Sequence, residues 1–328
     1  MMRYFIWMAY FLISSYGNAQ TSNAQRQPQP VAQEPSQVDY PSYYRAIVEA
    51  EQFVSQQAYE TALGVYQNSF VTYRTGFLRD YKIATQLAFY LGKTNQGFSL
   101  LQQAIAHGWE IKEVKKMSFF DKIKEKREWK SIIAQYPTPR ETYLQGLHLD
   151  DRAVVHQLFR KDQRKAFRAL FLFTTKAQDR YGKRVFAPHS ERQVHELNKI
   201  MATYGYPGEK LIGNSYWASV ILSHHNSMYG DYVKTDTLYP QMRPKLLQAV
   251  ELGQMSPREF ARVDEWYTVI KSEGKDHGYG YLRQVETKSE QEQADQRRAQ
   301  LGISSLAVVS RLLAIERETG LNFYLPKM

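Results

Sequence analysis

The feature that most constrains this sequence is a helical spacing of apolar residues, which begins near Tyr43 and continues through most of the chain. In the stretch YYRAIVEAEQFVSQQAYETALGVYQNSF, apolar residues recur every three or four positions, first through Ile47 and Val54 and then through Ala62 and Phe70. Such spacing is typical of amphipathic helices. Alternating strand patterns and Asn-Gly hairpin turns are scarce. The chain is therefore predicted to be all-α.

Two predicted helix pairs in the N-terminal half repeat the same pattern. Shifting the first pair by 35 residues aligns three pairs of positions, namely Ala62 with Gly97, Tyr66 with Leu101 and Ser69 with Ala104. Small residues recur where two helices must approach closely, and large ones recur where helices interlock. This period, together with the strings AYETAL and LLQQAIAHGW, resembles tetratricopeptide repeats. The resemblance covers residues 41–136 and predicts a short helical repeat domain at 40–137.

A tetratricopeptide-like array implies a concave surface that binds a protein or peptide partner. With two units visible, such a groove is shallow. The alternative is a helical brace that docks against the second domain. The spacing of the residues does not choose between these two roles.

The first residues predict export. Arg3 is a lone charge before an uncharged run from Tyr4 to Ile13, and small and polar residues lead to a cleavage point at Ala19-Gln20. This is the order of a secretory signal peptide, predicted at residues 1–19. The apolar run is about ten residues long, whereas a membrane-spanning helix needs roughly twenty. We therefore expect a periplasmic or extracellular protein, with an uncleaved N-terminal anchor as the alternative.

Residues 20–39 are rich in Gln, Pro and Ser and hold almost no large apolar residue, so we expect a disordered linker there. No later stretch is long and apolar enough to predict a transmembrane segment in the mature chain. The chain has no cysteine. Disulfides, thiolate metal sites and cysteine nucleophiles are therefore excluded.

The net charge is +10, and its excess is concentrated in KEVKKMSFFDKIKEKREWK and RKDQRKAFR. One interpretation is attraction to an anionic envelope component such as lipid headgroups or a polyanionic glycan. The other is solvated helix faces, as the interspersed Asp121, Glu125 and Glu128 indicate. No motif of a nucleic-acid-binding family is present, so nucleic acid is not a predicted partner.

A second domain is predicted at 145–328, after the Pro- and Gly-containing stretch YPTPRETYLQG. Ser190 is predicted to cap a helix that ends at Gly205. Ser256 is predicted to cap another helix, with Pro257 at its first position and Gly274 at its end. The domain is therefore predicted to be a compact helical bundle.

Several segments of this domain resemble, in their order, an uncharacterised bacterial family known only as a domain of unknown function. They are Asp162-Gln163 with Arg164 and Arg168 behind them, YGYPGEKLIG, a helix ending at His225, LLQAVELGQMSPREFARVDE, GKDHGYGY and RRAQLGIS. That family often follows tetratricopeptide-like repeats in exported proteins. The resemblance covers about residues 150–305. It implies a shared fold and pocket but no reaction.

The family pattern carries over to specific residues. It implies a role for His225 at the end of the middle helix, for Asp264 on the next helix, and for His277, Tyr279 and Gly280 in the glycine-led segment. This sequence departs from the pattern with His277 in place of glutamine and with Glu265 where arginine usually follows the aspartate. These departures put a precise transfer of roles in doubt.

The candidate site therefore combines residues from several helices. The candidate catalytic residues are His225, Asp264 and His277, and the candidate binding residues are Asp162, Gln163, Arg164 and Tyr279. An imidazole can act as a general base near neutral pH, with a carboxylate fixing its tautomer. His225 and His277 with one carboxylate could instead bind zinc or iron, although no HExxH motif is present. The sequence requires no cofactor.

The adjacent histidines cannot both face one ligand, because neighbouring helical positions point about 100° apart. We expect His225 to face inward and His224 to be partly solvated. A structural histidine at a helix end is the alternative to either chemistry. The sequence thus predicts an exported scaffold that binds a protein or a ligand, with an envelope hydrolase using His225 or His277 and Asp264 as the alternative.

Overall fold

A computed structural model describes residues 38–213, 215–228 and 230–325. Within these residues every regular element is a helix and no strand occurs. The predicted all-α fold class is therefore confirmed. The predicted signal peptide, and the predicted linker up to residue 37, lie outside the described residues.

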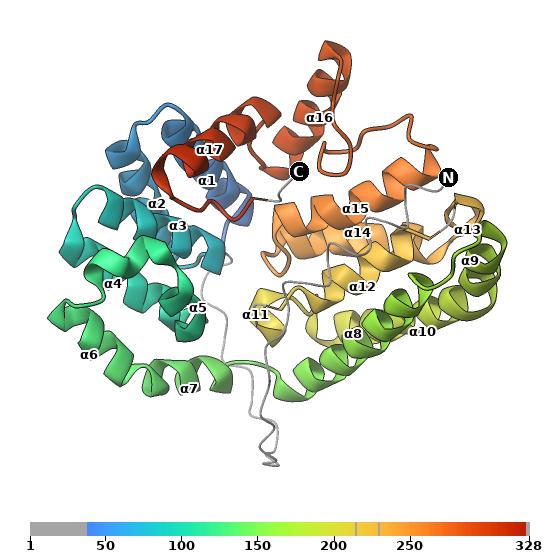
Figure 1. The fold of residues 1–328 in the computed structure, drawn as a ribbon, viewed down its shortest axis with the longest axis horizontal. Coiled ribbons are helices and arrows are strands. Elements are labelled where there is room, and N and C mark those ends of the chain that lie inside the picture. Colours follow the sequence, from blue (N-terminus) through green and yellow to red (C-terminus); the bar gives the residue numbers. More distant parts are fainter. Residues whose placement is uncertain (1–37, 214, 229, 326–328) are drawn as a thin grey trace.

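The helices form two groups, which appear as two lobes in Figure 1. The N-terminal lobe contains α1 (Tyr40–Ser55), α2 (Tyr59–Tyr73), α3 (Leu78–Tyr90), α4 (Thr94–Ala106), α5 (Ile111–Lys116), the 3₁₀ helix η2 (Ser118–Ile123), α6 (Arg127–Gln135) and α7 (Pro137–Gln145). The C-terminal lobe contains α8 (Leu149–Ala169), α9 (Thr175–Tyr181), the π-helix η3 (Gly182–Phe186), α10 (Ala187–Tyr204), α11 (Glu209–Ile212), α12 (Trp217–Asn226), α13 (Gly230–Thr235), α14 (Leu238–Glu251), α15 (Pro257–Lys271) and α16 (Lys288–Leu301). The last helix, α17 (Leu306–Thr319), returns to the N-terminal lobe.

The N-terminal lobe is built from packed helix pairs. α1 packs along α2, α3 packs along α4, and α2 contacts α3. All six positions that the 35-residue shift aligns are buried. A Cβ atom on Gly97 would lie 2.7 Å from the ring of Phe89, so this glycine is needed for the close helix approach. Membership in the tetratricopeptide family stays a prediction.

The predicted helix caps are partly correct. Ser256 caps α15 by accepting a hydrogen bond from the Glu259 amide at 3.2 Å, and Pro257 occupies the first helical position. Ser190 is not a cap, because α10 begins three residues earlier at Ala187 with Pro188 in its first turn. Ser190 is instead fully buried inside the helix.

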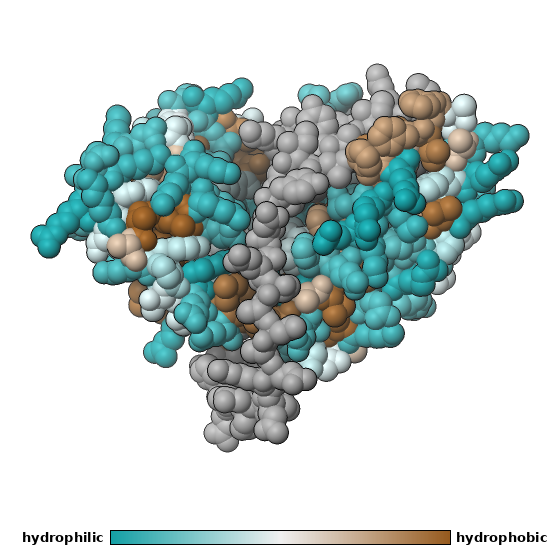
Figure 2. Space-filling model, turned by 60° about the horizontal axis from the view of Figure 1, so that its bottom comes forward, coloured by the Kyte–Doolittle hydropathy of each residue, from teal (hydrophilic) through white to brown (hydrophobic). Residues whose placement is uncertain are grey.

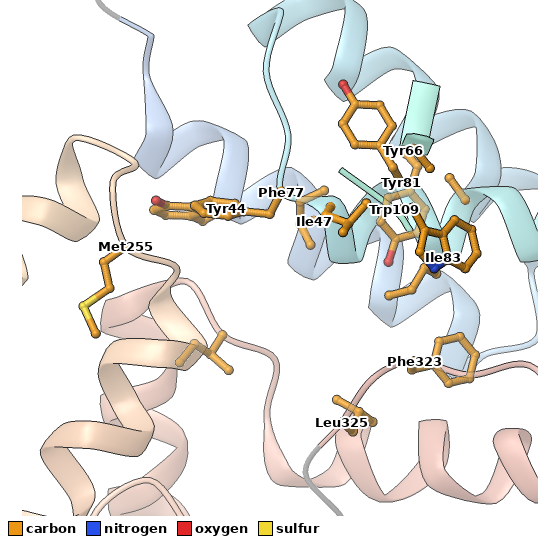
Figure 3. Close-up of a cluster of buried hydrophobic side chains, with 14 of the residues drawn as sticks. Tyr44, Ile47, Tyr66, Phe77, Tyr81, Ile83, Trp109, Met255, Phe323 and Leu325 are labelled. Carbon is orange, nitrogen blue, oxygen red and sulfur yellow. The ribbon is translucent and has the colours of Figure 1, made fainter. Parts of the chain in front are cut away.

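The C-terminal end of the chain packs on the N-terminal lobe. α17 lies against α1. Beyond it, Asn322 exchanges hydrogen bonds of 2.9 and 3.0 Å with Gln86 of α3, and Phe323 packs in the same hydrophobic cluster as Trp109 (Figure 3). Residues 306–325, which the sequence assigns to the C-terminal domain, thus help to hold the two lobes together.

The surface is mostly hydrophilic on the face shown in Figure 2, with hydrophobic residues in separate patches. In the described part of the chain, no single helix has the length and apolar composition needed to cross a membrane. Only α16 and α17 taken together, with a bend of 86° between them, meet that test by length and composition.

Candidate functional site

The residues predicted to share one pocket lie in several separate hydrogen-bond networks. The first joins α8 to α12. His224 is 5% exposed, so the prediction that it is partly solvated is wrong. Its Nδ1 lies 2.5 Å from Oδ2 of the buried Asp162, and Gln163 donates to the same oxygen at 3.2 Å. Arg164 is exposed and its Nε donates to the Arg160 carbonyl.

His225 belongs to a second network and is buried, as predicted. Its Nδ1 lies 3.0 Å from the Ser190 hydroxyl, and its Nε2 lies 3.3 Å from Oδ2 of Asp236. Asp236 also accepts the amides of Leu238 and Tyr239 at the start of α14. Burial alone would raise the pKa of Asp236, but His225 and these amides outweigh burial and lower it. The serine, histidine and aspartate are adjacent, yet Ser190 and His225 are too deeply buried to meet a substrate.

Asp264 is the centre of a third network. Its carboxylate accepts hydrogen bonds from Arg243 Nε at 2.7 Å, Arg243 Nη2 at 3.0 Å, the Tyr239 hydroxyl at 2.9 Å and the Tyr279 hydroxyl at 3.0 Å. A carboxylate with four donors has little accepting capacity left for a substrate or a histidine. Asp264 therefore anchors α14 and the glycine-led segment to α15.

Glu265 organises the glycine-led segment. Its carboxylate accepts the amide of Tyr281 at 2.9 and 3.0 Å and that of Leu282 at 2.9 Å. Gly278 has φ +58°, and a Cβ there would lie 2.6 Å from Cγ of Glu265. Burial raises the pKa of Glu265 to about 7, although the amides oppose that shift. Glu265 stands where the resembled family pattern has arginine, and here it has a structural role. Gly278 permits the tight turn around it.

His277 lies apart from these networks. Its Nδ1 is 3.6 Å from Oε1 of Glu290, the residue that completes the capping box of α16. Within the described residues, no hydrogen bond or ion pair joins His277, His225 and Asp264 to one another. Nor does any group of three His, Asp or Glu side chains in these ranges have the arrangement needed to hold a metal ion. The alternative of a zinc or iron site at His225 and His277 stays untested.

A pocket instead lies between the two lobes, with a volume of about 120 Å³. This volume is somewhat smaller than the roughly 150 Å³ of a cavity that accepts benzene in another protein, so the pocket can hold a small group such as a carboxylate or phosphate. Its aromatic wall includes Tyr44 and Phe77, which stack at 6.2 Å and are seen together in Figure 3. Its charged residues come from both lobes, namely Arg79, Asp80, Glu209, Arg258, Glu259 and Arg262.

Glu51 holds two of the pocket arginines in place. It is fully buried on α1, beside the pocket, and its carboxylate lies 2.7 Å from Arg79 Nη1 and 2.5 Å from Arg258 Nη2. Ser304 donates a further hydrogen bond to it. Burial alone would raise the pKa of Glu51, but Arg258 and Arg79 lower it to about 2. Arg79 Nη2 and Arg258 Nη1 are buried and find no acceptor within the described ranges.

The pKa values of the other carboxyl groups of the pocket are raised. Glu209 is partly exposed, and its carboxylate accepts the Leu78 amide at 2.6 Å, which lowers its pKa. Loss of water around the carboxyl group outweighs this hydrogen bond and raises the pKa to about 8. Burial also raises the pKa of Glu259, despite a 2.8 Å hydrogen bond from Tyr206, and that of Asp80, despite Arg79. At neutral pH the Glu209 carboxyl is mainly protonated, which removes one negative charge from a pocket wall that carries three guanidinium groups.

The sequence contained signals for this pocket that our prediction did not use. Glu51 lies four positions after Ile47 and therefore falls on the apolar stripe of α1. A charged residue on a buried stripe indicates a buried partner. Arg258 lies in the first turn of α15, where the helix dipole disfavours a positive charge, so it too indicates another electrostatic role.

Comparisons with models of protein families, with curated proteins and with solved structures found no match. The two family resemblances stated from the sequence therefore stay predictions.

Proposed function

We propose that this is an exported protein of the periplasm or cell envelope that binds a small ligand carrying a carboxylate or phosphate group in the pocket between its lobes. Export rests on the predicted signal peptide. The N-terminal helix pairs would add a surface for a protein or peptide partner, as their predicted repeat implies.

The observation that carries the ligand proposal is the convergence of three arginines from both lobes on one pocket. Arg79 comes from α3, and Arg258 and Arg262 come from α15. Guanidinium groups are suited to carboxylate and phosphate because two parallel N–H donors match two oxygens. An unsatisfied buried donor costs about 1–3 kcal/mol. A small rotation of Arg79 or Arg258 toward a bound anion would give its unpaired nitrogen an acceptor.

The hydrolase alternative receives no comparable support. His225 and Asp264 are buried in separate networks, and His277 belongs to a third group of contacts. The pocket also contains none of these three residues. Ligand binding is therefore the function that the geometry favours.

Thermal unfolding tests the proposal. The probes are acetate, succinate and inorganic phosphate, each compared with chloride at equal ionic strength. A bound anion should raise the unfolding temperature, since a ligand at a hundred times its Kd adds about 2.7 kcal/mol of stability. Arg262→Gln should abolish the increase, because Arg262 lines the pocket without contacting Glu51.

Arg160→Gln is the matched control, because Arg160 is exposed on α8 and does not line the pocket. This variant should keep the full response. The proposal is wrong if no probe stabilises the native chain more than it stabilises Arg262→Gln.

A further inference from the structure

The end of α8 and the turn that follows it expose large aromatic side chains. Phe167, Phe171 and Phe173 have exposed fractions of 49, 58 and 91%. The first two rings contact each other edge to face, with centroids 5.0 Å apart. Scattered single apolar residues are ordinary on a protein surface, but a cluster of large ones marks an interaction site.

The segment that carries these phenylalanines is rich in exposed basic residues. Residues 160–185 contain one exposed acid, Asp179, and eight exposed basic side chains, namely Arg160, Lys161, Arg164, Arg168, Lys176, Arg180, Lys183 and Arg184. The other acid of the segment, Asp162, is buried against His224. In the part of the chain that the structure describes, no carboxylate lies within ion-pair distance of Arg164, Arg168 or Lys176. We call Phe167, Phe171, Phe173 and these eight basic residues the aromatic-basic surface.

The other basic stretch predicted from the sequence is different. Lys124 pairs with Asp121 at 2.6 Å, and Lys130 pairs with Glu125 at 2.9 Å. Its charges are thus partly compensated by neighbouring acids, as the solvated-face interpretation expects. In the aromatic-basic surface, by contrast, Arg164, Arg168 and Lys176 have no such neighbouring acid among the described residues, and the exposed charges of the segment are predominantly positive.

Packing and hydrogen bonds hold the backbone of the aromatic-basic surface in place. Beneath it, Ala166 and Phe186 pack in a separate hydrophobic cluster with Trp266. The Tyr181 hydroxyl donates to the Lys165 carbonyl at 3.0 Å, and the Gln178 amide donates to the Leu172 carbonyl at 2.8 Å. These contacts fix α9 and the intervening turn against α8. The phenylalanines are therefore presented outward by packed structure.

We propose that the aromatic-basic surface binds peripherally to a bilayer that contains anionic lipids. Phenylalanine rings enter the boundary between headgroups and acyl chains, and the surrounding Lys and Arg side chains contact lipid phosphates. A bilayer fits better than a protein groove, because the rings protrude and the exposed charge of the segment is predominantly positive. None of these residues lines the pocket between the lobes, so the inference does not depend on the proposed ligand.

A local fluorescence measurement on the full chain tests this inference. Because the chain has no cysteine, Phe173→Cys provides a unique site for an environment-sensitive dye. Vesicles of phosphatidylcholine with phosphatidylglycerol should shift the dye emission to the blue, and vesicles of pure phosphatidylcholine should not. Val71→Cys is the matched control, because Val71 is 75% exposed on α2 in the other lobe. Its dye should remain in water.

Charge reversal then tests the role of the basic residues. In the labelled Phe173→Cys chain, Arg164→Glu with Arg168→Glu should weaken vesicle binding roughly tenfold or more, since each basic residue near an anionic surface contributes about a fivefold factor. Lys122→Glu with Lys126→Glu changes the net charge equally in the other basic stretch and should have a much smaller effect.

Three results would overturn the inference. One is an equal emission shift at positions 71 and 173, which would show adsorption without insertion of this turn. Another is an equal loss of binding in both charge-reversed variants. The last is the absence of any shift at position 173 with anionic vesicles.

Discussion

Glu51 of α1 and Arg258 of α15 form a buried ion pair at 2.5 Å, although 207 residues separate them in the chain. Arg79 of α3 shares the same carboxylate. The pair joins the two lobes at the wall of the pocket. One side chain therefore supports both the contact between the lobes and the position of two candidate ligand-binding groups.

Replacing Glu51 with Gln should strongly destabilise the protein. The substitution keeps the shape of the side chain but removes the counter-ion that two largely buried guanidinium groups share, so that Arg258 loses this carboxylate and Arg79 keeps only its 3.2 Å pair with Asp80. Removing one partner of a buried pair costs roughly 3–5 kcal/mol. Urea denaturation of Glu51→Gln should show a loss of this size. Glu113→Gln is the control, because Glu113 pairs with Lys82 and its side chain is 53% exposed. A loss at Glu51 no larger than that control would contradict the role of the buried pair.

Two glycines should respond in opposite ways to alanine. Gly278 has φ +58°, and a new Cβ would lie 2.6 Å from Cγ of Glu265, so Gly278→Ala should cost roughly 1–3 kcal/mol through backbone strain and steric overlap. Gly64 lies within α2 with no atom within 4 Å of the added carbon. Gly64→Ala should therefore stabilise the helix by roughly 0.5–1 kcal/mol. Equal effects in a urea titration would show that the turn around Glu265 is not tightly constrained.

The two histidines of the predicted site should differ in their effect on stability. His225→Ala removes a buried partner of Ser190 and Asp236 and should cost about 1–3 kcal/mol, with an added cost for the cavity. His277→Ala removes a side chain that is 13% exposed and whose Nδ1 lies 3.6 Å from Oε1 of Glu290, a weaker contact, and should cost about 1 kcal/mol or less. Chemical denaturation of both variants measures the difference. Unchanged stability in His225→Ala would contradict the structural role of that histidine.

Local patterns could be predicted from the sequence because their physical causes lie within a few residues. The spacing of apolar residues predicted the helices, and the Ser256-Pro257 pair predicted the start of α15. Ser190 had the same local signature as Ser256 but not the same role. The helix α10 begins at Ala187, three residues before Ser190, with Pro188 in its first turn. The Ser190 hydroxyl contacts His225 on another helix. A local cap signal cannot reveal such a tertiary contact.

The candidate site was predictable only in part. Asp264 and Tyr279 were both singled out, and their side chains do meet at 3.0 Å. Asp162 was grouped with His225 but pairs with His224, because neighbouring positions on α12 face different helices. The partnership of Glu51 with Arg258 could not follow from spacing, since it depends on how two distant helices pack across the lobes.

The stability of the protein should fall as pH rises from about 5 to about 8, and Glu209 should be one cause. Its pKa is raised from 4.5 to about 8, mainly because the surrounding protein displaces water from the carboxyl group. The folded chain therefore keeps a proton that the unfolded chain releases in this range. By proton linkage, stability then decreases with pH, by at most about 1.4 kcal/mol per pH unit for one group. Glu265, with a pKa of about 7, acts in the same direction.

Glu209→Gln isolates the contribution of that residue, because glutamine keeps an oxygen acceptor for the Leu78 amide and does not titrate. We expect the free energy of unfolding of the variant to decline less than that of the native chain between pH 5 and pH 8. Glu51 has the opposite effect, and only at lower pH. Because its pKa is lowered from 4.5 to about 2, the free energy of unfolding of both proteins should decrease as the pH is lowered from about 4.5. Urea titrations across this pH series measure the difference. Parallel pH profiles for the two proteins would show that Glu209 already loses its proton in the folded chain near its ordinary pKa.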